Sequence, residues 1–353
     1  MDHVAPRADA VADFSGWLPI RVFLKDNTAW VDWIYRGDYR FEDSFFRDDV
    51  NFLLRKPFNR AFRRYTSMAV MVEWAERELR RGATQHAPLK AFVAHASRCG
   101  STLVAQMLAH LPTHVVMSEP PMLDVLLSIG TMLPQITRDV QIRWLRALVF
   151  ALAQTPQHEH HLVIKLDAWH VFSHDLLAEA FPGVPCLFLF RNPVEIAASM
   201  LAQPSAYMAA GMVTAYSRLG ADEPLNMQME DFIARDLGLL FASAAILCDQ
   251  YGVIPVPYTT LPQAVWTDLG EVLGLTRSAD ETALLQHVTK RDAKAPSMTF
   301  APDSERKQRE TSALLRELVS DSCNANYVRL LASSARVATD AFCNQPLSSS
   351  LVD

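Results

Sequence analysis

Residues 91–108 read Ala-Phe-Val-Ala-His-Ala-Ser-Arg-Cys-Gly-Ser-Thr-Leu-Val-Ala-Gln-Met-Leu. An apolar run, a polar turn and an amphipathic run follow one another, which predicts a strand, a tight loop and a helix. Gly100 would let the backbone approach an anion, Arg98 would add a charged fork, and Ser101 and Thr102 would offer hydroxyl and amide groups at the helix N-terminus. The stretch therefore predicts a phosphate-binding loop. A strand-to-helix turn whose Ser-Thr pair only caps the helix is the alternative.

This loop differs from that of nucleoside-triphosphate enzymes, which need the pattern GxxxxGK[ST]. With Gly100 as the second glycine, His95 stands at the first glycine position and Ser101 at the lysine position. The sequence therefore disfavours an ordinary kinase or ATPase. A P-loop kinase-like phosphotransferase with a displaced cation stays as an alternative.

Short apolar runs alternate with longer amphipathic runs beyond the loop as well. The strand candidates are 91–95, 114–117, 162–166, 186–190 and 253–256. The helix candidates are 102–110, 139–154, 173–181, with Ser173 as N-cap, 193–202 and 229–251. This alternation predicts an α/β fold with a doubly wound, mostly parallel sheet, whose ligands bind at the carboxyl ends of the strands.

The chain outside this alternation divides into an N-terminal and a C-terminal part. Residues 17–46 are rich in aromatics, and the alternating stretch 30–35, followed by Arg36-Gly37-Asp38, predicts a strand, a turn and a return strand. After Leu261 the pattern is helical to about residue 339. We expect three parts: 1–90, a loose arm to about Phe14 and a β/helical element packed on the core; 91–340, the α/β domain with a helical C-terminal region; and 341–353, a flexible tail.

Composition limits the class of protein. The formal net charge of the 353 residues is -6, which argues against a protein that coats nucleic acid, so any anion site must be local. The longest strongly apolar stretch, 237–248, is shorter than the roughly 20 residues that span a bilayer, and residues 1–14 have no apolar signal-peptide core. The five cysteines are odd in number and scattered, which favours reduced thiols. We expect a cytoplasmic protein without a membrane span or a nucleic-acid partner.

A second motif lies at 185–200: Pro-Cys-Leu-Phe-Leu-Phe-Arg-Asn-Pro-Val-Glu-Ile-Ala-Ala-Ser-Met, a buried strand ending in Arg191, with Ser199 in the next helix. Taken together with the loop, it resembles the sulfotransferase family. In that family a [KR]-x-G-[ST]-T loop binds the 5′-phosphosulfate of 3′-phosphoadenosine 5′-phosphosulfate (PAPS), and a strand-end Arg with a Ser eight residues later binds the 3′-phosphate. The resemblance runs from about 92 to 275 and implies a P-loop sulfotransferase fold of bacterial type. The cofactor-binding residues that it implies in these motifs are Arg98, Cys99, Gly100, Ser101, Thr102, Leu103, Arg191 and Ser199.

Three smaller correspondences extend the resemblance. Lys165 ends the strand candidate 162–166 near the point where cytosolic sulfotransferases carry a lysine that contacts the transferring sulfuryl group. Tyr258-Thr-Thr-Leu resembles the Tyr-Glu-Asp-Leu segment of the family, although Thr replaces both acids, and implies a cofactor contact for Tyr258. The basic cluster 290–294 could supply the late segment that closes over the 3′-phosphate through Lys294, and a solvated basic turn is its alternative.

Three residues are candidates for the base that accepts the proton of the acceptor. Glu119 follows the strand candidate 114–117, where protein-tyrosine and many bacterial sulfotransferases have a catalytic glutamate, and is the first choice. Asp167 is the rival, because cytosolic sulfotransferases place a histidine two residues after the strand-end lysine, where this chain has an aspartate. His170 could reach the same space, although a lone histidine at a strand-to-helix junction is more often structural.

The resemblance implies a PAPS-dependent sulfotransferase that moves a sulfuryl group to a hydroxyl or amine of a small-molecule acceptor, with Lys165 stabilising the developing charge. No metal is expected: the metal-like run Gln157-His-Glu-His-His161 is interpreted as a solvated loop. A sulfotransferase-fold module that binds nucleotide without catalysis is the non-enzymatic alternative. The acceptor and the oligomeric state stay open.

Overall fold

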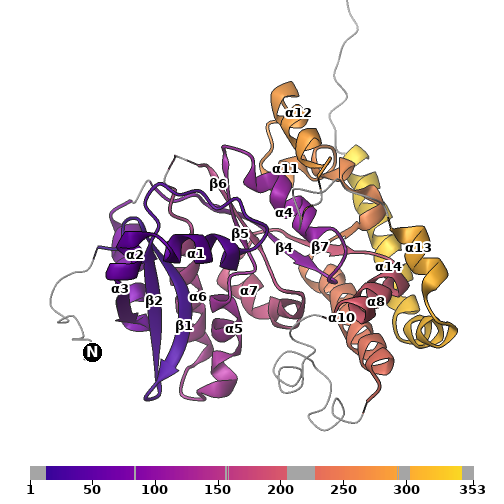
Figure 1. Cartoon of the computed structure of the whole chain (residues 1–353), viewed down its shortest axis with the longest axis horizontal. Coiled ribbons are helices and arrows are strands. Elements are labelled where there is room, and N and C mark those ends of the chain that lie inside the picture. Colours follow the sequence, from indigo (N-terminus) through magenta and orange to yellow (C-terminus); the bar gives the residue numbers. More distant parts are fainter. Residues whose placement is uncertain are drawn as a thin grey trace, which may run out of the picture. The chain divides into compact units, whose positions relative to one another are not determined.

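The computed structural model describes residues 13–343, apart from 83–84, 156, 158, 205–226, 292 and 294–302 (Figure 1). The described residues form two compact units, and the chain passes between them several times. The first unit contains described residues of 1–93, 102–184 and 278–300, and the second contains those of 94–101, 185–277 and 301–353. The division of the chain at residues 90 and 340, made from the sequence, stays a prediction.

An antiparallel three-stranded sheet opens the first unit. Strand β1 (Trp17–Lys25) pairs with β2 (Thr28–Tyr35), and β2 pairs with β3 (Arg64–Ser67). The predicted N-terminal β element is therefore present, and so is the turn at 36–38, where Gly37 has a φ of 56° and the Tyr39 N–H donates to the Arg36 carbonyl oxygen at 3.3 Å. The return strand expected directly after this turn was wrong, because the next strand, β3, begins only at Arg64. The hairpin turns at Asp26 and Asn27, whose φ values of 51° and 57° are those that Asp and Asn tolerate better than other side chains.

Aromatic side chains and short helices cover this sheet. The helices are α1 (Phe46–Leu54), α2 (Pro57–Ala61) and α3 (Met68–Arg80). Phe14, which the sequence analysis placed in a loose arm, is fully buried: its ring stacks on Trp33 at 4.3 Å between centroids and meets Trp74 edge-on at 5.4 Å. The expectation was wrong for Phe14 because a large apolar ring gains more from this pocket than it loses in chain freedom. Residues 1–12 lie outside the described part of the chain.

The main sheet confirms the predicted α/β class. Its strands are β4 (Leu89–His95), β5 (His114–Ser118), β6 (His161–Lys165), β7 (Cys186–Phe190) and β8 (Ile254–Pro257), in the order β5-β6-β4-β7-β8. The pairs β4–β6, β5–β6 and β7–β8 are parallel. Each predicted strand matches an observed one to within two residues. Strands β5 and β7 are buried along their whole length, which explains why β7 is apolar throughout and why the centre of β5, Val115–Met117, is a continuous apolar run instead of an alternating one.

The predicted helices that connect these strands are also present. In the first unit they are α4 (Ser101–Ala109), α6 (Arg138–Leu152) and α7 (His174–Ala180), and in the second unit α8 (Pro193–Ala202) and α10 (Met229–Tyr251). Ser173 does precede α7, but its side chain makes no capping hydrogen bond, because a 3₁₀ turn, η1 (Ala168–Ser173), leads directly into the helix. Helix α5 (Met122–Met132) was not predicted.

Helices make up the chain after β8. They are α11 (Gly270–Leu273), α12 (Ala279–Val288), α13 (Ser304–Glu310) and α14 (Ala313–Cys343), with the short turns η3 (Tyr258–Thr260) and η4 (Gln263–Val265) before them. In the second unit α8, α10, α13 and α14 lie side by side (Figure 1). A Cβ atom at Gly238 of α10 would lie 2.9 Å from the carbonyl oxygen of Ser322, so the glycine allows α10 and α14 to approach closely. The apolar stretch 237–248 is therefore a core helix.

Within the described part of the chain, no helix combines the length and the apolar character that crossing a bilayer would require. The tail after residue 343 lies outside the described residues.

Candidate functional site

The phosphate loop predicted from the sequence connects β4 to α4. Ser97, Arg98 and Gly100 all have positive φ, at 61°, 48° and 88°. Left-handed backbone at Ser and Arg costs on the order of 1–3 kcal/mol each, so the surrounding structure must hold it in place. Two hydrogen bonds to the carbonyl oxygen of Leu189 in β7 do part of this: the Ala96 N–H donates at 2.9 Å and the Cys99 thiol at 3.0 Å.

Gly100 is required at its position for two reasons. Its φ of 88° is strained for any other residue, and a Cβ atom there would lie 3.1 Å from the Tyr258 ring and 3.1 Å from the Leu261 side chain. The loop thus packs directly against the turn that follows β8. Gly100 and Tyr258, two of the predicted cofactor-binding residues, are neighbours in the second unit.

The other residues of the loop are held in distinct ways. Arg98 donates from its guanidinium to the backbone oxygen of Gln203 at 2.7 Å and to its side-chain oxygen at 3.2 Å, just beyond the end of α8. Ser101 and Thr102 are buried in the first turn of α4, and Leu103 is partly exposed. The loop therefore places backbone N–H groups at the start of a helix, where the helix dipole favours an anion.

Arg191 directly follows β7 and is buried. Its Nε donates to Glu195, and its Nη2 donates to Asp303 at 2.9 Å and to the Ser304 hydroxyl at 2.7 Å. The Tyr258 ring lies over the guanidinium, 4.3 Å from its carbon to the ring centroid. Burial alone would lower the pKa of Arg191, but the Asp303 hydrogen bond and the Glu195 charge raise it, so the cation is firmly held.

The surroundings of Arg191 include both predicted and unpredicted residues. The Ser199 hydroxyl donates to the backbone oxygen of Glu195 at 3.0 Å, which places Ser199 one turn further along α8. Asp303 and Lys307, joined at 2.6 Å, were not predicted, because no motif connects residues so far along the chain with Arg191. Lys294 lies outside the described residues, so its role stays a prediction.

In the first unit, Glu119 and Lys165 form an ion pair in which the lysine is buried and the glutamate side chain is 23% exposed. Lys165 ends β6 with its side chain 1% exposed, and its ammonium group donates to the Glu119 carboxylate. The Glu119 N–H donates back to the Lys165 carbonyl oxygen at 2.8 Å. Glu119 has a φ of 58°, a conformation that costs energy for glutamate and that turns the chain at the end of β5.

Asp167 and His170, also in the first unit, share hydrogen bonds across the start of η1. The Asp167 side chain accepts from the His170 N–H, and the Asp167 N–H donates to His170 Nδ1 at 3.2 Å. Because Nδ1 accepts a hydrogen bond, the ring proton of neutral His170 is on Nε2, which donates to Asp124 at 2.7 Å. Trp169 donates to the same carboxylate oxygen at 2.8 Å.

The environment of Asp167 favours its protonated form. Burial of its carboxyl group and the negative charge of Glu119 raise its pKa to about 7, against the opposing effect of His170. Asp124 was not predicted from the sequence, since nothing in the pattern of α5 connects that residue with His170. The residues Asp167, His170 and Asp124 therefore form one hydrogen-bonded group with a carboxyl that titrates near neutrality.

The same three residues also lie close enough together to offer ligands to a metal ion. Their potential ligand atoms lie within 4.8 Å of one another. Both ring nitrogens of His170 are already hydrogen-bonded, one to the Asp167 N–H and one to Asp124. Hydrogen bonds alone therefore account for the arrangement.

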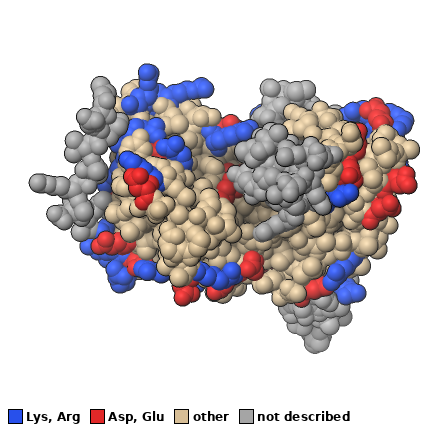
Figure 2. All heavy atoms as spheres, turned by 90° about the horizontal axis from the view of Figure 1, so that it is seen from below, with Lys and Arg blue, Asp and Glu red and all other residues tan. Residues whose placement is uncertain are grey.

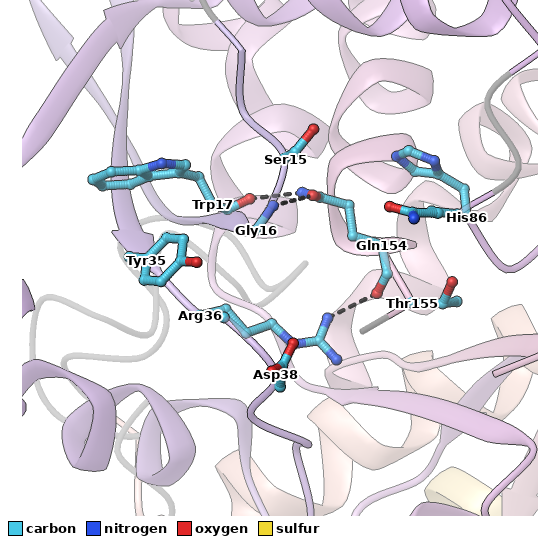
Figure 3. Close-up of a pocket in the computed structure, with 11 residues that line it drawn as sticks. Ser15, Gly16, Trp17, Tyr35, Arg36, Asp38, His86, Gln154 and Thr155 are labelled. Carbon is cyan, nitrogen blue, oxygen red and sulfur yellow. Dashed lines mark hydrogen bonds between the residues drawn. The ribbon is translucent and has the colours of Figure 1, made fainter. Parts of the chain in front are cut away.

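A cavity of about 340 Å³ lies elsewhere in the first unit, and none of the predicted site residues lines it. Figure 3 shows how Gln154 bridges its wall: the side chain accepts from the Gly16 N–H and donates to the Trp17 carbonyl oxygen, while Arg36 donates to the Gln154 carbonyl oxygen. Burial lowers the pKa of His86, beside these residues, to about 4. Arg36 thus ties the end of β2 to the end of α6, which is a structural role.

Charged side chains of both signs are interspersed on the face seen in Figure 2.

Comparisons with known proteins gave matches only among solved structures. No family model and no curated protein matches the chain. A sulfotransferase from Alicyclobacillus acidocaldarius is 18% identical with a TM-score of 0.41, covering 70% of this chain and 96% of that one. Sulfotransferase STF9 from Mycobacterium avium is 12% identical with a TM-score of 0.43, covering 72% of this chain and 81% of that one.

A sulfotransferase domain from the curacin biosynthetic pathway is 14% identical with a TM-score of 0.38, and the match covers 74% of this chain and 100% of that one. All three structures carry the name of the family that the two sequence motifs resemble. At this level of similarity, the residues themselves must carry any conclusion about function.

Proposed function

We propose that the protein is a sulfotransferase that moves a sulfuryl group from PAPS to a hydroxyl or amine of a small-molecule acceptor. The observation that carries the proposal is in the second unit: a strained loop with Gly100 at its apex packs against Tyr258, and the ring of Tyr258 covers the buried guanidinium of Arg191. One aromatic ring thus contacts both of the motifs that the resemblance to sulfotransferases assigns to a single nucleotide.

In this proposal the two motifs bind different ends of the donor. Arg98 and the N–H groups of residues 100–103 hold the 5′-phosphosulfate, as a helix N-terminus preceded by a cation would. Arg191 holds the 3′-phosphate, with Ser199 supplying a hydroxyl. The support for these roles is the position of each residue directly after a strand or within the helix that follows it.

Transfer would proceed by in-line attack. The acceptor oxygen or nitrogen forms a bond to sulfur, the bond from sulfur to the bridging phosphate oxygen breaks, and the acceptor proton passes to a base. The products are the sulfated acceptor and 3′-phosphoadenosine 5′-phosphate. Lys165 is the proposed cation for the charge that develops on the bridging oxygen.

Among the candidate bases, we favour Asp167. A carboxyl with a pKa of about 7 is ionised to a useful extent at neutral pH and still binds a proton readily. Glu119 is a weaker candidate, because the buried ammonium of Lys165 stabilises its carboxylate. In this arrangement Glu119 positions Lys165, and His170 fixes the backbone of Asp167 through Nδ1.

Isothermal titration with 3′-phosphoadenosine 5′-phosphate tests the proposal. We expect the wild-type protein to bind it, and Arg191→Ala to weaken binding at least tenfold while leaving adenosine 5′-phosphosulfate, which lacks the 3′-phosphate, little affected. Arg235→Ala is the matched control, since Arg235 is an exposed cation of the same unit that pairs with Asp231 at 3.3 Å. Absence of nucleotide binding to the folded wild-type protein would refute the proposal, and tight Mg²⁺-dependent binding of ATP would favour a kinase-like phosphotransferase.

A nucleotide-binding module without catalysis is the second candidate. The ion pair that engages Glu119, the base expected first from the sequence, favours it. Such a module would bind the nucleotide normally, and Asp167→Ala and Glu119→Ala would change no measurable turnover.

A cytoplasmic location belongs to the proposal as well and rests on the scattered cysteines.

A further inference from the structure

Arg191 is enclosed by carboxylates that belong to this chain. Glu195 binds its Nε, and Asp303 and Ser304 bind its Nη2. The edge of the guanidinium formed by Nε and Nη2, with which arginine grips a phosphate in a bidentate manner, is therefore occupied.

Other contacts hold Asp303 in this position. Its second carboxylate oxygen pairs with Lys307 at 2.6 Å, and Gln308, on the same short helix α13, donates to Glu195 at 2.5 Å. Although burial alone would raise the pKa of Asp303, hydrogen bonds from Lys307 and Arg191 lower it, so the group is an anion at neutral pH. These side chains form a cluster of two cations and two carboxylates whose charges balance: Arg191, Lys307, Glu195 and Asp303.

Of the two carboxylates in this cluster, Asp303 is the more accessible to solvent and to an incoming ligand. The Asp303 side chain is 34% exposed, whereas that of Glu195 is 6% exposed. Helix α13 buries none of its own residues, and Asp303, which precedes it, makes no capping hydrogen bond with its side chain. Asp303 is therefore the partner that an incoming anion would displace from Arg191.

We propose that Asp303 is a specificity-determining residue that competes with the nucleotide 3′-phosphate for Arg191. This inference rests on the proposed function. A nucleotide with a 3′-phosphate binds only by displacing the Asp303 carboxylate from Nη2, whereas a nucleotide without that phosphate leaves the contact in place. Asp303 thereby lowers the affinity for nucleotides that carry a 3′-phosphate and leaves the affinity for those without it unchanged.

Titration calorimetry with Asp303→Asn tests this role. The substitution keeps the size of the side chain and removes its charge, and Asp303→Ala also removes the acceptor that asparagine retains. We expect both variants to bind 3′-phosphoadenosine 5′-phosphate about tenfold more tightly than the wild type, with unchanged affinity for adenosine 5′-phosphosulfate. Glu305→Gln is the matched control: it removes an exposed carboxylate two residues along, outside the cluster, and is expected to change neither affinity.

The outcomes separate this inference from the function on which it rests. Equal affinity of the wild type and both Asp303 variants for 3′-phosphoadenosine 5′-phosphate would overturn the role of Asp303 and leave the proposed function standing. An equal gain in affinity for both nucleotides, or the same gain in Glu305→Gln, would mean that the loss of any negative charge favours nucleotide binding. Either result would also overturn the role of Asp303. Absence of binding to any of the folded proteins would refute the proposed function and the role of Asp303 with it.

Discussion

Lys165 and Glu119 are joined twice, once through their backbones and once through their charges. The Glu119 N–H donates to the Lys165 carbonyl oxygen at 2.8 Å, and the Lys165 ammonium donates to the Glu119 carboxylate. The first contact continues the parallel pairing of β5 with β6, in which Ser118 lies opposite Lys165. The fold thus brings the carboxylate to a lysine whose side chain is 1% exposed.

Glu119→Gln should destabilise the protein, because it leaves the Lys165 ammonium buried without its counter-charge. We expect the free energy of unfolding to fall by about 3 kcal/mol in urea denaturation. Glutamine keeps the same backbone strain, so the loss of charge is isolated. The double variant Lys165→Met with Glu119→Gln removes both charges and should recover most of the stability. A loss below about 0.5 kcal/mol in the single variant would show that the pair contributes little.

Asp167 should make stability depend on pH. Its pKa is raised from 3.8 to about 7, so between these values the folded protein binds a proton that the unfolded chain releases. The contribution of Asp167 to the free energy of unfolding is therefore greatest below pH 3.8 and falls as the pH rises from there to about 7. We expect Asp167→Asn to reduce the difference in unfolding midpoint between pH 5 and pH 8. Asp49, whose pKa burial also raises to about 7, contributes with the same sign, so the variant should lessen the difference without abolishing it.

The carboxyl carbon of Asp167 gives a direct measurement of the same effect. Its NMR chemical shift should titrate with a midpoint near pH 7. A midpoint near 4 would contradict both the stability prediction and the choice of Asp167 as the base.

Gly100→Ala should affect stability more than a glycine substitution with a similar backbone elsewhere. Gly252 also has positive φ, at 66°, but a Cβ atom there would meet nothing within 4 Å, so Gly252→Ala measures backbone strain alone. At Gly100 the added methyl group also meets Tyr258 and Leu261 at 3.1 Å. We expect Gly100→Ala to cost about 1–2 kcal/mol more than Gly252→Ala and to abolish nucleotide binding. Thermal unfolding measures the stability of the two variants, and titration calorimetry measures their nucleotide binding. Equal losses of stability and of binding in Gly100→Ala and Gly252→Ala would contradict the close packing of Gly100 against Tyr258 and Leu261.

Phe14→Ala should reveal how much the start of the described chain contributes to the core. The ring is fully buried between Trp33 and Trp74, so its removal should lower the free energy of unfolding by about 3–5 kcal/mol. Phe62→Ala, which truncates a ring that is 59% exposed, should change it by less than about 1 kcal/mol. If the free energy of unfolding fell by a similar small amount in both variants, Phe14 would belong to the loose arm expected from the sequence and not to the core.

Prediction from the sequence succeeded where local pattern determines local structure. Buried strands such as β7 are continuous apolar runs, and α8 begins at the Asn192-Pro193 pair, where the asparagine side chain caps the helix. It failed at the first hairpin, where the turn residues Asp26 and Asn27 were not recognised between two strands. Local pattern also gave the strand-end positions of Lys165 and Arg191.

The partners of the site residues could not be predicted in the same way. Asp303 reaches Arg191 across 112 residues of chain, and Asp124 reaches His170 across 46. Such contacts depend on how helices pack after they form, and a single sequence carries no periodic signal for them. The cationic and hydroxyl groups of the site and one of the carboxylates, Glu119, were therefore identified from the sequence. Asp303 and Asp124, which reach their partners from distant elements, were not.

The path of the chain through its two units has a consequence for synthesis on the ribosome. The first unit includes described residues of 278–300, and the second begins with residues of 94–101. In the first unit, the Ser44 hydroxyl donates to the carbonyl oxygen of Ala293 at 2.5 Å. An N-terminal fragment therefore lacks part of the first unit until residue 293 has been made. A C-terminal fragment that starts after residue 101 lacks the phosphate loop between β4 and α4. Neither unit can be cut out as one continuous piece of chain, so each must be studied by substitution within the whole protein.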